Sequence, residues 1–66
     1  MERFTQKEME EAQRVIMSLL HKCERATEKL APGTSQHTLM QNRIAALRLS
    51  LFLIRENLLQ MSMAAK

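Results

Sequence analysis

The chain has 66 residues, a net charge of +3 and one cysteine, so its length allows one small domain. A chain of this size buries only about 60% of its unfolded surface, and small domains usually compensate with disulfides, a metal or association. Because Cys23 is the only cysteine, an internal disulfide is excluded and a four-ligand zinc site is disfavoured. We expect no cofactor and no metal, and association becomes the expected source of further stability.

Neither a cleavable signal nor a membrane span is predicted. Residues 1–8 are polar and contain no apolar core segment. Arg43, Arg48 and Arg55 interrupt the apolar run of the second half, so its stretches are far shorter than the roughly 20 residues that a spanning helix needs. We therefore expect a cytoplasmic protein without a membrane partner.

The first helix is predicted over about residues 6–31. Thr5 and Glu8 fit a capping box, and Phe4 and Met9 occupy the two positions of a hydrophobic staple. Apolar residues then recur in steps of three and four, which predicts one buried seam. The seam consists of Met9, Ala12, Ile16, Leu19, Cys23, Ala26 and Leu30, and Val15 and Leu20 widen it.

A turn is predicted at residues 32–35. Pro32 disfavours helical geometry at Ala31 and forms a turn pair with Gly33, so the first helix should end there. The candidate caps of the second helix, predicted over about residues 36–63, are Thr34, Ser35 and Thr38. A connection this short makes the two helices antiparallel neighbours.

The second helix carries a seam that matches the first. Its members are Met40, Ile44, Leu47, Leu51, Ile54, Leu58, Met61 and Ala65. Folding about Ser35 sets Leu30 against Met40, Ala26 against Ile44, Cys23 against Leu47, Leu19 against Leu51, Ile16 against Ile54, Ala12 against Leu58 and Met9 against Met61. Three of these layers pair a small residue with a large one, which fills space without voids. The expected fold is all-α, an antiparallel two-helix hairpin.

The second helix is also apolar on the side away from this seam. Its outward positions include Ala45, Ala46, Leu49, Phe52 and Leu53. Burying the three large side chains would contribute about 4 to 9 kcal/mol, whereas a core this small rarely nets more than about 3 to 5. We therefore expect these five residues to form an interface. The simplest closed solution is a two-fold homodimer whose hairpins form a four-helix bundle.

The arginines and the single cysteine give weaker indications of function. Arg48 and Arg55 are the candidate contacts if the chain binds RNA or DNA as a Rop-like bundle, but with only Phe52 able to stack a base we favour solvated arginines. Cys23 and His21 lie two residues apart and point to different sides of a helix, so no nucleophile and base pair is expected. The sequence contains no catalytic constellation, and we expect no enzyme.

One segment resembles a known group of proteins. It comprises Gly33 to Leu39 (Gly-Thr-Ser-Gln-His-Thr-Leu), Asn42 to Ile44, and Ala46 with Leu47. This pattern is similar to short uncharacterised helical-hairpin proteins of clostridial-type bacteria and their prophages, which implies a bacterial origin and no assigned activity. The length and two-helix plan are also similar to the co-chaperones of type III secretion needle subunits. Short sporulation phosphatases are helical hairpins too, but their Ser-Gln-x-x-Asp signature is not met here, because Leu39 stands at the position of the acid.

These observations favour a non-enzymatic, self-associating helical interaction or assembly module, with a dimer as the first expectation. A first alternative is a small co-chaperone or subunit whose outward face is covered by a different protein, as in the needle co-chaperones. A second alternative is the Rop-like nucleic-acid-binding bundle.

Overall fold

Helix α1 begins at the capping box that the sequence predicts. In the computed structural model, which describes residues 3–64, α1 spans Gln6–Glu28. The backbone N–H of Thr5 donates to Oε1 of Glu8 at 2.9 Å, and the backbone N–H of Glu8 donates to Oγ1 of Thr5 at 3.1 Å. Both halves of the box are therefore present, and the predicted start of the helix is confirmed.

The first helix ends three residues earlier than predicted. Its last turn tightens, because the backbone N–H groups of Lys29 and Leu30 donate to the carbonyls of Ala26 and Thr27, three residues back in each case. Pro32 disfavours helical geometry at Ala31, but α1 ends before it reaches that residue. A tightened turn at Lys29 and Leu30 separates the end of α1 from Ala31.

The connecting turn places a glycine where a side chain would be strained. Gly33 has a φ of +88°, a conformation that residues with a Cβ rarely adopt. Thr34 follows it, and its Oγ1 accepts a hydrogen bond at 3.2 Å from the backbone N–H of His37. Of the three candidate caps, Thr34 is therefore the one used, and α2 spans Ser35–Ala64.

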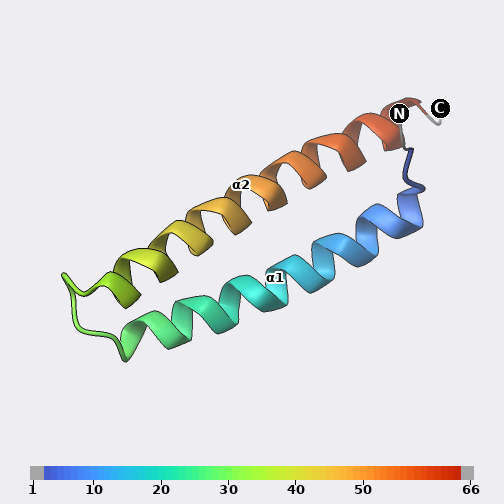
Figure 1. Ribbon diagram of the computed structural model, residues 1–66. Coiled ribbons are helices and arrows are strands. Elements are labelled where there is room, and N and C mark those ends of the chain that lie inside the picture. The colour runs from blue at the N-terminus through green and yellow to red at the C-terminus, as the bar shows by residue number, and fades with distance from the viewer. Residues whose placement is uncertain (1–2, 65–66) are drawn as a thin grey trace.

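The two helices pack side by side as an antiparallel hairpin, which confirms the predicted fold class (Figure 1). The hairpin is a rod of 49 × 19 × 18 Å. Leu20 of α1 and Leu51 of α2 are the two buried hydrophobic residues among those described, with 8% and 7% of their surface exposed. The described seam positions of α2, from Met40 to Met61, are all at least half-buried. Ala65, predicted as the last member, lies outside the described residues.

The seam of α1 corrects one predicted layer. Leu19 was expected to face Leu51, but Leu19 is 45% exposed and its neighbour Leu20 is buried instead. Gln13 and Thr27, at seven-residue intervals from Leu20, are half-buried as well. Successive helical residues differ by about 100° in direction, so a stripe with apolar residues at both 19 and 20 fits either phase. The structure adopts the phase that centres on Leu20.

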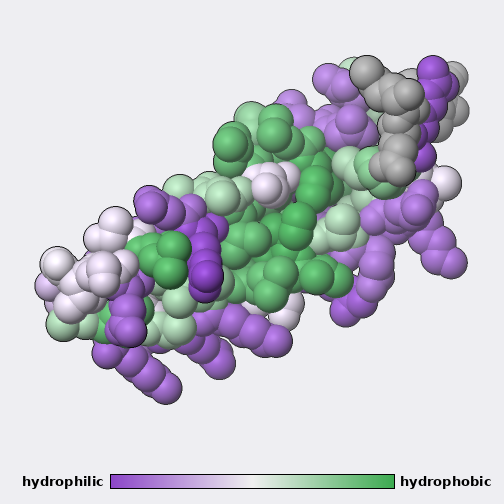
Figure 2. Space-filling view, in the orientation of Figure 1, coloured by the Kyte–Doolittle hydropathy of each residue, from purple (hydrophilic) through white to green (hydrophobic). Residues whose placement is uncertain are grey.

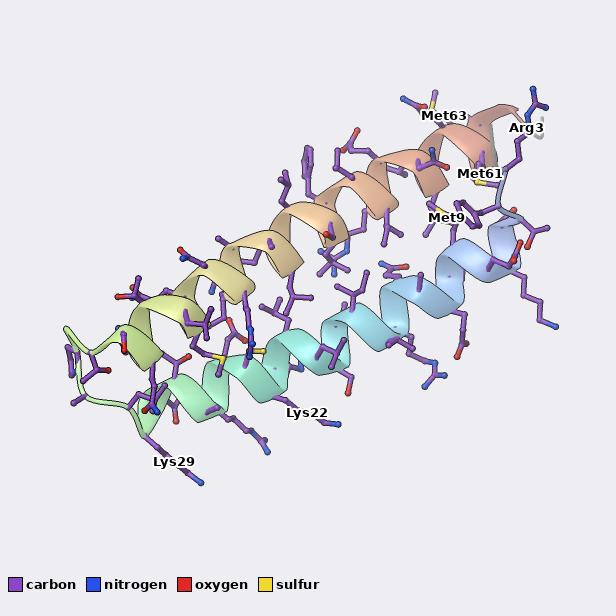
Figure 3. The ribbon with its side chains drawn as sticks, viewed as in Figure 1. Arg3, Met9, Lys22, Lys29, Met61 and Met63 are labelled. Atoms are coloured by element: carbon purple, nitrogen blue, oxygen red, sulfur yellow. The ribbon has the colours of Figure 1, made fainter. Side chains whose placement is uncertain are left out.

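The register of the hairpin agrees with the predicted one at the end near the termini. Met9 and Met61, a predicted layer, line the same surface pocket near the two ends of the chain and lie near each other in Figure 3. Close to the turn, Ile44 lines a second pocket with Thr27 and not with its predicted partner Ala26, in keeping with the phase that centres on Leu20. In the same figure Lys22 and Lys29 project away from α2, so the side of α1 opposite the seam carries charge.

Candidate interaction surface

The two helices differ in how their apolar residues are distributed. Helix α1 is amphipathic, with a polar side toward solvent, whereas α2 carries apolar residues around most of its circumference. In isolation the hairpin covers only the seam of α2. Five large hydrophobic residues of α2 remain more than half exposed on its other sides in addition to Leu39: they are Leu49, Phe52, Leu53, Leu59 and Met63.

All five residues predicted as an interface are exposed. The exposed fractions are 61% for Leu49, 58% for Phe52 and 57% for Leu53. Ala45 and Ala46 lie one turn earlier on the same helix and are exposed as well. The hairpin therefore presents these side chains to a partner without any change in its own packing.

Leu59 and Met63 extend this surface, and the sequence interpretation missed them. We define the outer stripe of α2 as six positions in steps of four and three: Ala45, Leu49, Phe52, Glu56, Leu59 and Met63. Met63 projects from the side of α2 that faces away from α1 (Figure 3). The spacing alone could have revealed the stripe, but Glu56 interrupts its apolar character and hides the continuity.

A second apolar area lies on one broad face of the hairpin. Figure 2 shows hydrophobic surface that runs across both helices at the middle of the rod, with polar side chains gathered toward the two ends. Helix α1 exposes Val15 and Leu19, each at 45%. Leu19 was expected in the seam and Val15 was expected to widen it, so this area was also missed from the sequence. It follows from the rotation of α1 that buries Leu20.

The two arginines considered for nucleic acid have different environments. The guanidinium of Arg48 donates to a carboxylate oxygen of Glu24 at 2.8 Å, which ties the middle of α2 to α1. Arg55 lies two helical turns further and forms no ion pair with residues 3–64. Arg48 is thus paired with a carboxylate of α1, whereas Arg55 has no such pair among the described residues.

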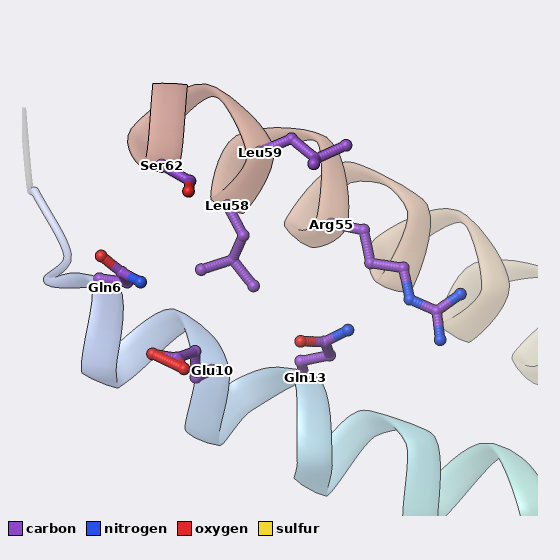
Figure 4. A pocket seen from close by; sticks show the side chains of 7 residues that line it. All are labelled: Gln6, Glu10, Gln13, Arg55, Leu58, Leu59 and Ser62. Carbon is purple, nitrogen blue, oxygen red and sulfur yellow. The ribbon is translucent and has the colours of Figure 1, made fainter. Parts of the chain in front are cut away.

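Arg55 also lines an open groove near the termini. The groove has a volume of about 460 Å³ and is lined by Gln6, Glu10, Gln13, Arg55, Leu58, Leu59 and Ser62 (Figure 4). Its amides and opposite charges can form hydrogen bonds, but they come from both helices without a buried polar group among the described residues. Leu59 belongs both to this groove and to the outer stripe, so Arg55 borders the stripe.

Other chemistry has little support within residues 3–64. No group of three or more His, Cys, Asp or Glu gathers where it could hold a metal ion in this part of the chain. Cys23 is a free thiol, half-buried beside the seam. Over the same residues, neither helix is long and apolar enough to cross a bilayer.

The chain matches no protein-family model, no curated protein and no solved structure.

Proposed function

We propose that this protein is a non-enzymatic helical module that works by associating with a second copy of itself. The single observation that carries the proposal is the outer side of α2, where Leu49, Phe52 and Leu53 are each more than half exposed. Among residues 3–63 of the same hairpin, two hydrophobic residues are buried. A helix that is apolar nearly all round belongs in the interior of an assembly. In this proposal α2 lies at the centre and α1 at the periphery.

The total exposed surface supports the same conclusion. The chain exposes 5618 Å². A compact monomer of 7.7 kDa is expected to expose about 4,300 Å². Two hairpins would reach the surface expected of one compact protein of twice the mass by burying about 4,000 Å² in total, which lies within the range of obligate homodimers. The excess is therefore of the size that one further copy can cover.

A two-fold dimer is the simplest arrangement, because it uses the same patch on both copies and closes without leaving a free surface for further addition. Two antiparallel hairpins joined in this way make a four-helix bundle.

Light scattering on the purified chain tests the proposal. We expect a monodisperse dimer of about twice 7.7 kDa. Replacing Leu49 and Phe52 together by Glu should yield a monomer or an unfolded chain, because four carboxylates would be buried at the interface. The matched control places two Glu at exposed positions elsewhere, Ser18→Glu with Gln36→Glu, and should remain a dimer.

Two results would contradict the proposal. A monodisperse monomer of the unchanged chain would rule out self-association. An unaltered dimer in the Leu49→Glu, Phe52→Glu variant would show that association uses another surface.

A further inference from the structure

The outer stripe of α2 has the spacing of a coiled-coil seam. Its six positions follow one another in steps of four, three, four, three and four, which is the heptad pattern of a helix that packs against another helix. It is the second such seam on α2. At about 100° per residue it is centred roughly 120° around the helix from Leu51, so α1 cannot cover it.

We propose that a second copy docks its own α2 antiparallel along this stripe, in the register where facing residue numbers sum to 108. This inference rests on the proposed self-association and names the surface and the register that it uses. The layers are then Ala45 with Met63 of the second copy, Leu49 with its Leu59, and Phe52 with its Glu56, each occurring twice.

Size complementarity favours this register over its neighbours. All six stripe positions face stripe positions, and the smallest residue, Ala45, meets the long and adaptable Met63. Sliding one helix by seven residues toward the N-terminus sets Leu59 against Asn42 and Met63 against Thr38. Sliding it the other way removes Ala45 and Leu49 from the apolar layers. Both shifts bury less apolar surface.

Charge complementarity is compatible with the same register. Glu56 is the one charged member of the stripe and has no ion pair with residues 3–64. In the proposed layer it faces Phe52 of the second copy, which Arg48 precedes by four residues and Arg55 follows by three. Since Arg48 already binds Glu24, Arg55 is the cation left for Glu56. A polar residue at one seam position costs stability but specifies register and orientation.

Disulfide trapping tests the register directly. In a Cys23→Ala background, Leu49→Cys and Leu59→Cys are made as two separate variants. We expect a mixture of the two to form a covalent dimer on mild oxidation, because the two positions face each other across the interface. Each variant alone should stay uncrosslinked, since neither position faces itself in this register. The single variants are thus the matched controls for the mixture.

The possible failures can be told apart. If the unchanged chain is a dimer but the mixture does not crosslink, the register is wrong and the proposed self-association stands. If Leu49→Cys crosslinks with itself, the helices pair in parallel or in a different antiparallel register, and the proposed register is again wrong. If the unchanged chain is a monomer by light scattering, both proposals fall.

A charge exchange tests the ion pair. Glu56→Arg and Arg55→Glu each bring like charges together across the interface, so each should raise the dimer dissociation constant at least about tenfold in sedimentation equilibrium. The double variant exchanges the two charges and should recover most of that loss. A double variant that dimerises no better than the weaker single variant would show that Arg55 and Glu56 do not meet.

Discussion

At the scale of single residues, the core depends on a choice between two adjacent leucines. Leu20 is buried and Leu19 is 45% exposed, although both lie on the apolar side of α1. The difference arises because α1 meets α2 at Leu51, and only one of two neighbouring positions can point at that side chain. The two leucines should therefore contribute unequally to the free energy of unfolding.

We expect Leu20→Ala to lower the free energy of unfolding by about 2 to 3 kcal/mol, because it removes buried methyl groups and leaves a cavity. Leu19→Ala should cost about 1 kcal/mol or less, because nearly half of that side chain is already in water. Urea denaturation of both variants at one fixed protein concentration makes the comparison. An equal or larger loss for Leu19→Ala would support the other phase of the α1 seam.

At the scale of the helix, the start of α1 is held by a charged cap. The backbone N–H of Thr5, and secondly its hydroxyl, form hydrogen bonds with Glu8 and hold the pKa of that carboxyl below its ordinary value. A depressed pKa means that the folded state favours the ionised form. Glu8 therefore contributes stability above the ordinary carboxyl pKa, and that contribution is lost as the pH falls through the lower value of the folded state.

The expected pH dependence can be isolated with Glu8→Gln, which keeps an acceptor oxygen but removes the charge. The unchanged chain should be more stable than Glu8→Gln at pH 7, and the difference should shrink as the pH falls below about 4. Helix content followed by circular dichroism in urea at several pH values measures this difference. Glu10→Gln is the matched control, because Glu10 lies two residues further along α1, outside the capping box. A difference that stays constant with pH would contradict the role assigned to the cap.

The two helices also differ in how much apolar surface they leave exposed to water. Helix α1 can leave its polar side in water, where Lys22 and Lys29 project (Figure 3). Helix α2 cannot do so without exposing Leu49, Phe52, Leu59 and Met63. This difference between α1 and α2 follows from the distribution of apolar residues around each helix. Under the proposed self-association, α1 would lie at the surface and α2 would be surrounded.

At the scale of the whole molecule, the proposed association would link stability to protein concentration. The hairpin is a rod of 49 × 19 × 18 Å, and the described part of the chain buries two hydrophobic residues, which is a small core. If a second copy covers the outer stripe, unfolding and dissociation occur together. The apparent stability then depends on protein concentration.

We expect the melting temperature to rise by about 5 °C for each tenfold increase in protein concentration, given the unfolding enthalpy typical of a dimer of two such chains. Calorimetry over a hundredfold range of concentration measures it. The Leu49→Glu, Phe52→Glu variant, if it folds, should melt at a temperature independent of concentration. A concentration-independent melting temperature in the unchanged chain would mean that the hairpin unfolds as a monomer.

The sequence by itself determined the local features of this protein. The capping box at Thr5, the break at Pro32 and Gly33, and the register of the hairpin all follow from interactions between residues close in the chain or from the periodicity of one helix. The exposure of Leu49, Phe52 and Leu53 could be predicted in the same way, because the predicted α1 has only one apolar side to offer.

Only the tertiary structure decided which of two equivalent phases α1 adopts and which charges meet across the hairpin. A helix of 3.6 residues per turn with leucines at 19 and 20 can present either one, and the choice depends on how the side chains of α2 fill the space opposite. The contact between Arg48 and Glu24 has the same origin, since it joins residues 24 positions apart. Leu59 and Met63 became visible as part of the stripe once their exposure was known, because the charge of Glu56 conceals a pattern that is continuous in space.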